Sequence, residues 1–462
     1  MYDTIYDNDA PIECFTEEGL SRLFEGCTRL EDLCLESPPD LPAIPAAISI
    51  LAPRLAHLHL AADAHRLPDA FTSLRALRTC VLHMPSLQEL PLDFGSLTCL
   101  TSVELKVCQS LTSLPESFGE LAKLTRFTIR GCRSFRLPDC FPELQSLKEF
   151  QITLCDALSE LPGNFGQLPA LESLVMEVVD GITGLPESFG QLKRLQSLSI
   201  NACYDLLSLP SSMPDLSSLT SLDLNAPKLP VLPDGFGRSS NLQSLNLFSG
   251  SFTRLPDSLP LGAALQQLIL HSLHSLASLP DDLGNFSSLR WLEIVECTQL
   301  QQLPASLCLL SSLTRLTVSE CPAMVALPCA MGDGLHSLQE LTINCKNLTH
   351  LPPSFFRLTS LEQLGMFHLP CVRGPLPDGF SRFTRLRELS LVAMPHLTAL
   401  PASLAALAPT LTSLRVDGCS ELRDVVEELT QLATLQTLTF ACLDGLKSLP
   451  RFLGQLAYTQ QW

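Results

Sequence analysis

An apolar pattern recurs along this chain at a nearly constant interval. The clearest copy, LPESFGELAKLTRFTIRGCRSF, begins at Leu114, and apolar residues follow that leucine at +4, +7, +10, +13 and +15. The first copy begins at Leu20 and the last at Leu449, so 18 intervals cover 429 residues, a mean of about 24. A repeat of this length predicts a solenoid whose units pack only against their neighbours.

The pattern divides the chain into an N-terminal cap over residues 1–19 and a solenoid over residues 20–462, whose last unit is incomplete. The 19 units begin at Leu20, Ile44, Leu67, Leu90, Leu114, Leu137, Leu161, Leu185, Leu209, Leu232, Leu255, Leu279, Leu303, Leu327, Leu351, Leu376, Leu400, Val425 and Leu449.

Composition agrees with a stack of small, similar cores, because 46% of the 462 residues are hydrophobic and only 6% are aromatic. The formal net charge of −18 repels phosphate backbones and anionic lipid, so nucleic acid and membrane docking are disfavoured. Two interpretations of the acidity stay open: a solvated surface that keeps the chain soluble, or an acidic groove that selects a basic partner.

The amino terminus, MYDTIYDNDAPIECFTEE, carries acids where a secretory signal needs a positive start and an apolar run. The sequence also lacks an uninterrupted apolar stretch of the roughly 18 residues that a transmembrane helix requires. We therefore predict a cytoplasmic protein without membrane insertion. Secretion by an unconventional bacterial route is compatible with the same features.

The second half of each unit predicts a short strand. Residues Arg126 to Ile129 alternate polar and apolar side chains, which is the period of a strand with one buried face. The first half, from Leu114 to Leu121, predicts a short helical or irregular segment, because a proline at +1 suits a helix start. Successive strands then pair in parallel about 4.8 Å apart, with the strands on the concave side.

The consensus LPxSFGxLxxLxxLxIxxCxxLxx resembles the leucine-rich repeat family. It is similar to repeats of plant cytosolic disease-resistance receptors, plant Ras-group leucine-rich repeat proteins and some bacterial effectors. The resemblance implies an α/β solenoid with the shape of a horseshoe and a role in protein binding. The large receptors also carry a nucleotide-binding domain, whose GxxxxGK[ST] motif does not occur in this sequence.

Cysteine is frequent at +18 or its shifted equivalent, where the family resemblance implies a buried ladder of small thiols that satisfy turn backbone groups. Stacked disulfides and a metal site are the alternatives, but the predicted reducing compartment and the lack of a CxxC pair disfavour both. The cysteines at this position are Cys108, Cys132, Cys155, Cys203, Cys297, Cys321, Cys345 and Cys419.

Phenylalanine is frequent at +4, where it predicts a hydrophobic spine beneath the convex side. The residues in this column are Phe71, Phe94, Phe118, Phe141, Phe165, Phe189, Phe236, Phe355 and Phe380.

Three histidines, His57, His59 and His83, are expected on the concave face of two adjacent units, where imidazoles could bind a metal. No carboxylate or thiol completes the set at matching phase, so we predict solvated surface histidines and no metal site. The sequence also holds no HExxH or GxSxG motif, which disfavours an enzyme and gives no reason to expect a cofactor.

A partner is expected on the concave face, at the outward positions +11, +12, +14, +16 and +17. Most of these are small or polar, but two clusters depart from that, and exposed aromatics beside arginine are typical of binding hot spots. The first cluster is Phe248, Ile269, His271, Arg290, Trp291, Val295 and Glu296, and the second is Phe367 and His368.

The sequence therefore predicts a monomeric, intracellular scaffold that binds another protein on its concave face, in signalling or defence. The alternative is the substrate-recognition part of a ubiquitin ligase, or an effector that acts on host proteins.

Overall fold

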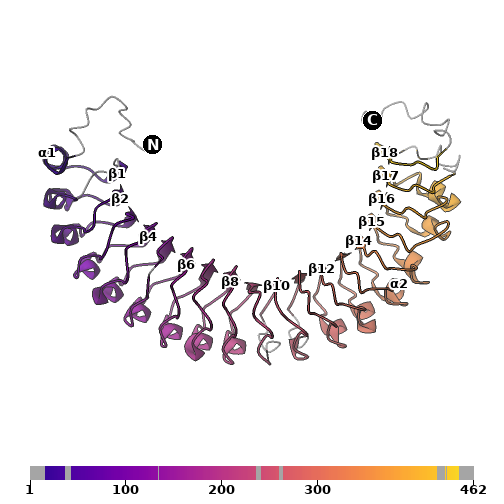
Figure 1. Ribbon diagram of the computed structural model, residues 1–462, viewed down its shortest axis with the longest axis horizontal. Coiled ribbons are helices and arrows are strands. Elements are labelled where there is room, and N and C mark those ends of the chain that lie inside the picture. Colours follow the sequence, from indigo (N-terminus) through magenta and orange to yellow (C-terminus); the bar gives the residue numbers. More distant parts are fainter. Residues whose placement is uncertain are drawn as a thin grey trace. The chain divides into compact units, whose positions relative to one another are not determined.

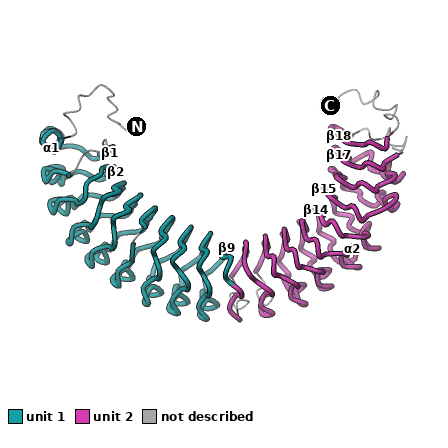
Figure 2. The backbone as a smooth tube through the Cα atoms, viewed as in Figure 1, with its two compact units in different colours: residues 1–229 teal, residues 230–462 magenta. Residues whose placement is uncertain are grey.

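The computed structural model describes residues 16–36, 43–133, 135–235, 241–259, 264–423, 432 and 434–446. The chain forms two compact units, residues 1–229 (unit 1) and residues 230–462 (unit 2), which Figure 2 draws in different colours. Within each unit, parallel strands line one side of the stack and short helices line the other (Figure 1). This is the α/β solenoid architecture expected from the repeat. No described helix has the length and apolar character needed to cross a membrane.

The strands of unit 1 are five residues long and pair in parallel in chain order. They are β1 (Asp32–Glu36), β2 (His57–Ala61), β3 (Thr79–His83), β4 (Ser102–Lys106), β5 (Arg126–Arg130), β6 (Glu149–Thr153), β7 (Ser173–Glu177), β8 (Ser197–Asn201) and β9 (Ser221–Asn225).

The strands of unit 2 have the same length and the same parallel order. They are β10 (Ser244–Phe248), β11 (Gln267–His271), β12 (Trp291–Val295), β13 (Arg315–Ser319), β14 (Glu340–Asn344), β15 (Gln363–Phe367), β16 (Glu388–Val392), β17 (Ser413–Asp417) and β18 (Thr437–Ala441).

The helices that face away from the strands are mostly single 3₁₀ turns. Unit 1 contains α1 (Glu17–Gly26), η2 (Ala46–Leu51), η3 (Asp69–Ser73), η4 (Phe94–Ser96), η5 (Glu116–Glu120), η6 (Phe141–Glu143), η7 (Phe165–Gln167), η8 (Glu187–Gln191) and η9 (Met213–Asp215). Unit 2 contains η12 (Leu283–Asn285), η13 (Ala305–Leu309), α2 (Met331–Gly334), η14 (Phe355–Arg357), η15 (Phe380–Arg382) and η16 (Ala402–Leu407).

The strands alternate buried and exposed side chains as the sequence predicted. In β5, Phe127 and Ile129 are fully buried, whereas Arg126, Thr128 and Arg130 lie on the outward face. Each strand pairs residue for residue with the next, so Phe127 lies opposite Phe150 in β6 and their rings stack 5.5 Å apart. The inward positions of successive strands therefore form continuous apolar rows.

A serine–glycine contact links several of the helical turns to the next and explains the SFG part of the repeat. The Gly190 amide donates a hydrogen bond to Oγ of Ser212 (3.2 Å), and this hydroxyl donates to the carbonyl of Glu187 (2.6 Å). A Cβ atom on Gly190 would lie only 2.2 Å from the Ser212 carbonyl oxygen. Glycine is therefore required here, because neighbouring turns approach too closely for a Cβ atom. The same link joins Gly95 to Ser117, Gly166 to Ser188, Gly284 to Ser306 and Gly332 to Ser354.

The predicted phenylalanine spine is present in the described residues. Phe71, Phe94 and Phe118 are fully buried, and neighbouring rings stack at centroid distances of 6.2 and 5.9 Å. Phe165 and Phe189 continue the column at 6.1 Å. Phe236 lies outside the described residues, as do residues 1–15 of the predicted cap and the unit starts Val425 and Leu449.

In many units, the residue that follows the strand has a left-handed backbone conformation. Glu296, for example, has a φ of 57°, and its amide donates to the carbonyl of Ser319 in the next unit (3.0 Å). The amide of His368 donates to the carbonyl of Val392 in the same way (2.9 Å). This conformation is unfavourable for residues other than glycine. It nevertheless extends the ladder by one bond and turns the following side chain inward. Such residues are Val107, Leu154, Val178, Ala202, Ser249, Ser272, Glu296, Glu320, His368, Ala393 and Cys442.

The cysteines at +18 stand directly after these strand ends, and all eight are buried free thiols. The Cys155 thiol donates to the carbonyl of Thr153 (3.4 Å), and the Cys297 thiol donates to Val295 and Leu270 (3.7 Å each). The thiols therefore satisfy backbone carbonyls inside the stack, as the family resemblance implied.

Candidate functional site

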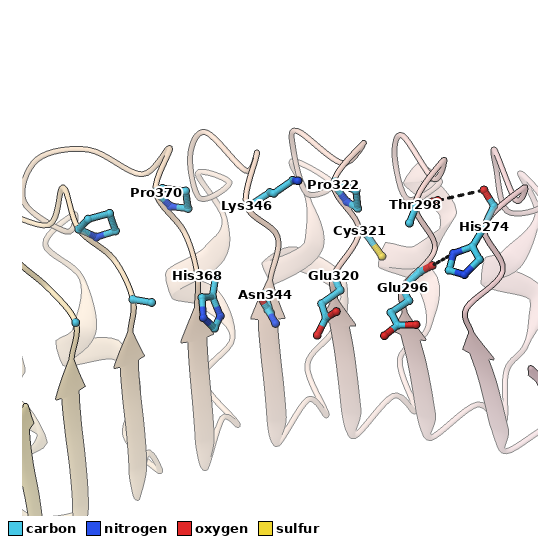
Figure 3. Close-up of a pocket in the computed structure, with 13 residues that line it drawn as sticks. His274, Glu296, Thr298, Glu320, Cys321, Pro322, Asn344, Lys346, His368 and Pro370 are labelled. Carbon is cyan, nitrogen blue, oxygen red and sulfur yellow. Dashed lines mark hydrogen bonds between the residues drawn. The ribbon is translucent and has the colours of Figure 1, made fainter. Parts of the chain in front are cut away.

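A pocket of about 850 Å³ lies in unit 2, where the chain leaves strands β11 to β17 (Figure 3). Most of these units contribute two lining residues. The first ends the strand or directly follows it, and the second lies two residues further along the chain. The lining residues are His274, Glu296, Thr298, Glu320, Cys321, Pro322, Asn344, Lys346, His368, Pro370, Ala393, Pro395 and Gly418.

The pocket wall nearer the strands is built largely from the left-handed residues. Glu296, Glu320, His368 and Ala393 belong to that set, with φ angles between 48° and 57°. Because this conformation recurs at the same place in successive units, it aligns their side chains in one row, as Figure 3 shows for Glu296, Glu320 and His368. The pocket is therefore a product of the repeat's backbone geometry.

The other wall is rich in proline and carries the pocket's lysine. Pro322, Pro370 and Pro395 occupy equivalent places in three units, and Lys346 occupies the same place between them. Proline presents a rigid apolar ring without a backbone donor. A ligand in the pocket would contact apolar rings on this side.

The acidic end of the pocket is partly fixed by hydrogen bonds. The Glu296 carboxylate accepts a bond from Oγ of Ser272 (2.7 Å), and its backbone carbonyl lies 3.1 Å from Nδ1 of His274, a contact drawn in Figure 3. Glu320 is exposed in the next unit. Two carboxylates thus face one end of the pocket, with Lys346 and His368 further along.

The predicted hot-spot residue Trp291 is half-buried on the outward face and held from two sides. Its indole nitrogen donates to Oε2 of Glu293 (3.0 Å), and the Arg315 guanidinium lies 4.8 Å from the ring centroid. Arg315 also pairs with both carboxylate oxygens of Glu340 on β14. These hydrogen bonds raise the pKa of Arg315 and keep the guanidinium charged.

The other members of the first cluster lie in different rows of the sheet. Phe248, His271 and Val295 are in register at the strand ends, and the rings of Phe248 and His271 meet edge to face at 5.4 Å. His271 also contacts Glu293 through Nε2 (2.7 Å). The predicted residues thus include a row at the strand ends that is connected to Trp291 through the carboxylate of Glu293.

Ile269 differs from the expectation. It occupies an outward strand position but is only 9% exposed, because it lies between Asn246 and Glu293 in the middle row of a crowded face. It therefore supports its neighbours and adds little apolar surface. Arg290, which precedes β12, is exposed.

The second predicted cluster is divided between the strand face and the pocket. Phe367 lies against Gly365 on its own strand, since a Cβ atom at that glycine would be 2.4 Å from Cε2 of Phe367. His368 is exposed and lines the pocket. Of the nine predicted residues, Glu296 and His368 line the pocket, while the others lie outside it. The proline row was missed, although its spacings of 48 and 25 residues, which correspond to two units and one, are visible in the sequence.

The predicted histidines His57, His59 and His83 lie on the outward face of β2 and β3. The prediction that no thiol or carboxylate shares their phase is wrong. Cys34 lies opposite His59 in register, and Glu36 is on the same face of β1. The unit that begins at Ile44 has one more residue before its strand than the unit that begins at Leu20. His59 and Cys34 therefore have different numbers when each is counted from the start of its unit, although they are opposite each other in the sheet.

No protein-family model and no curated protein matches this sequence. Solved structures do match in fold. A leucine-rich repeat protein of Leptospira interrogans is 24% identical with a TM-score of 0.63, and the match covers 85% of this chain and 91% of that one.

Two further solved structures show the same likeness. A TDR receptor is 20% identical with a TM-score of 0.57, over 96% of this chain and 77% of that one. A chain of the Drosophila Toll–Spätzle complex is 19% identical with a TM-score of 0.61, over 86% of this chain and 54% of that one. At these identities the likenesses establish a shared fold alone.

Proposed function

We propose that this chain, whose fold is that of a leucine-rich repeat solenoid, recognises a partner protein and that unit 2 binds an extended segment of that partner. The observation that carries the proposal is the pocket at the ends of β11 to β17. Its volume of about 850 Å³ falls within the range of ligand-binding clefts, roughly 300–1,000 Å³.

The pocket's dimensions suit a peptide in extended conformation. From the loop after β11 to the loop after β17 there are six strand spacings, or about 29 Å. An extended chain advances about 3.3 Å per residue, so roughly nine residues would span the pocket. The occupant we propose is therefore a peptide segment and not a compact small molecule.

The charges select a segment with a basic side chain at one end. Glu296 and Glu320 lie side by side in successive units, and a lysine or arginine placed between them would pair with both carboxylates. The proline rings provide apolar contact for the remaining residues. This agrees with the interpretation of the chain's acidity as selection for a basic partner.

Trp291 extends the proposed contact surface from the pocket along strand β12. It begins β12, and Glu296 follows the end of that strand, so the two lie about 16 Å apart at 3.3 Å per residue. A partner whose extended segment fills the pocket would place its adjacent surface over Trp291. This aromatic residue, restrained by Arg315 and Glu293, has the character of an interface hot spot.

Selection from a random-sequence peptide library on the full-length chain tests the proposal. We expect enrichment of extended peptides with lysine or arginine near one end and apolar residues beyond it. Glu320→Gln should lower the affinity for the selected peptides by about fivefold, the upper range for a single ion pair at a surface.

Glu388→Gln is the matched control, because Glu388 is also exposed but begins β16, at the end of the strand away from the pocket. It should leave affinity unchanged. Peptides that bind the parent and the Glu320 variant equally well, or a selection without basic residues, would refute the proposed site.

For the cellular setting we propose a monomer that acts in the cytoplasm, in signalling or defence. The free buried thiols support a reducing compartment. The resemblance to repeats of plant disease-resistance receptors supports the defence role.

A further inference from the structure

Three side chains with metal-binding atoms converge on the outward face of β1 and β2 in unit 1. Cys34 and His59 are direct neighbours in the parallel register, and Glu36 lies two residues beyond Cys34 on the same face. The thiol sulfur, an imidazole nitrogen and a carboxylate oxygen all lie within 4.8 Å of one another. The sheet fixes this arrangement, because the backbones of both strands are held by the ladder.

The spacing of the two nearest atoms fits a metal ion between them. Sγ of Cys34 lies 3.6 Å from Nδ1 of His59. In a tetrahedral zinc site, bonds of about 2.3 Å to sulfur and about 2.0–2.1 Å to nitrogen place those two atoms roughly 3.5 Å apart. The Cys34–His59 pair therefore has the edge length of a zinc tetrahedron, and a carboxylate oxygen of Glu36 within 4.8 Å of both atoms is the third candidate ligand.

We propose that Cys34, Glu36 and His59 bind a zinc ion, with water in the fourth position. Thiolate, imidazole and carboxylate are the three side-chain ligands that zinc uses, and three protein ligands with an open position form a recognised class of zinc site. The combination of soft sulfur with nitrogen disfavours magnesium and calcium, which prefer oxygen ligands.

The neighbouring histidines are assigned different roles by their contacts. Nδ1 of His57 lies 2.8 Å from Oγ1 of Thr79, so this imidazole is engaged with β3. His83 shares a row with Glu36, but Ala61 on β2 stands between them. Both are therefore outside the ligand set, although they share the face.

Bound zinc would join the first two strands through their side chains. All three ligands come from β1 and β2, so the ion binds the paired strands and not the separated chain. A ligand that binds only the folded form stabilises it in proportion to its concentration. Zinc should therefore slow amide exchange in β1 and β2, with little effect on strands far along the unit.

The test uses the full-length chain, with zinc for affinity and Co²⁺ as a spectroscopic probe. We expect one zinc ion per chain by calorimetry, and a thiolate-to-cobalt charge-transfer band with the visible absorption of a tetrahedral site. Cys34→Ser should abolish the charge-transfer band, because the thiolate gives rise to it. Cys34→Ser and His59→Gln should each weaken zinc binding by more than about 10-fold, the minimum that loss of a supporting group costs. Glu36→Gln should lower the affinity for zinc to a similar extent.

Matched controls separate this site from binding elsewhere. His57→Gln and His83→Gln remove imidazoles from the same face, and Cys329→Ser removes another exposed thiol. All three should bind zinc as the parent does. Retention of the cobalt band in Cys34→Ser would overturn the proposal. The proposal would also fail if His83→Gln lost as much zinc affinity as Glu36→Gln. Amide exchange without added metal confirms that each variant is folded.

Discussion

The Arg315 guanidinium lies over the indole of Trp291, 4.8 Å from the ring centroid, and the same guanidinium pairs with Glu340. Trp291 thus begins one strand, Arg315 the next and Glu340 the one after, all in register. A tryptophan held in this way loses little side-chain freedom when a partner covers it, so more of its contact energy is available for binding.

Trp291→Ala should weaken binding of a partner protein that covers this face by about 2 kcal/mol or more. The melting temperature should stay nearly unchanged, because Trp291 is half-buried and lies outside the apolar rows that hold the strands together. Calorimetry with the parent and the variant against one verified partner measures the difference.

Glu116→Ala is the control, because Glu116 lies in η5 on the side of unit 1 away from the strands. It should not change affinity. If Trp291→Ala binds as tightly as the parent, the contact surface lies elsewhere, and Phe367 with His368 becomes the next candidate.

Gly166→Ala should destabilise unit 1, whereas Gly163→Ala should not. A Cβ atom at residue 166 would lie 1.7 Å from the Ser188 carbonyl oxygen, but a Cβ atom at residue 163 meets nothing within 4 Å. The backbone must move to relieve the first overlap, at a cost of about 1–3 kcal/mol typical of overpacking. Chemical denaturation of both variants, which differ from the parent by one methyl group each, measures the contrast. Equal stability of the two would mean that neighbouring turns can separate freely.

The fold could be predicted from the sequence because apolar side chains recur at the same positions in unit after unit. Phe127 and Ile129 are inward, and Phe118 stacks in the spine, as alternation and spacing predicted. The contact between Gly190 and Ser212 was not predictable from one unit, since it joins residues in different units through a backbone carbonyl.

The candidate sites were less accessible to sequence reasoning. The pocket depends on the left-handed conformation of residues such as Glu320, which side-chain periodicity does not encode. The Cys34–His59 pair was missed because one additional residue precedes β2 and changes the phase of the count. Ile269 is covered although its position is outward, since exposure depends on the sizes of its neighbours. Small shifts in register and backbone therefore decide a site while leaving the fold intact.

The buried cysteines should resist alkylation in the native state, and alkaline pH should destabilise the fold. Burial raises the pKa of Cys155 and Cys203 to about 11 and that of Cys345 to about 12, from an ordinary value of 9.0. Above pH 9 the unfolded chain releases these protons while the folded chain retains them, so stability falls with rising pH. Each thiol contributes at most about 1.4 kcal/mol per pH unit until its folded pKa is reached.

Mass spectrometry after alkylation at several pH values checks this expectation. The exposed Cys34, Cys329 and Cys442 should react first, and the buried set should react only after denaturant is added. Disulfides among several buried cysteines in freshly purified protein would contradict both the free-thiol ladder and the proposed compartment.

Leu316→Ala should destabilise the solenoid locally, by about 2–5 kcal/mol. Leu316 is fully buried on the inward face of β13, and truncation leaves a cavity in a close-packed row. Leu309→Ala in the same unit is the control, because that side chain is 67% exposed and its loss should cost little. Since each unit contacts only its neighbours, faster amide exchange should be confined to β13 and the strands beside it. Simultaneous loss of protection in every strand of unit 2 would show that cooperativity extends beyond neighbouring units. Leu222→Ala, at the equivalent inward position of β9, should give the same local pattern in unit 1.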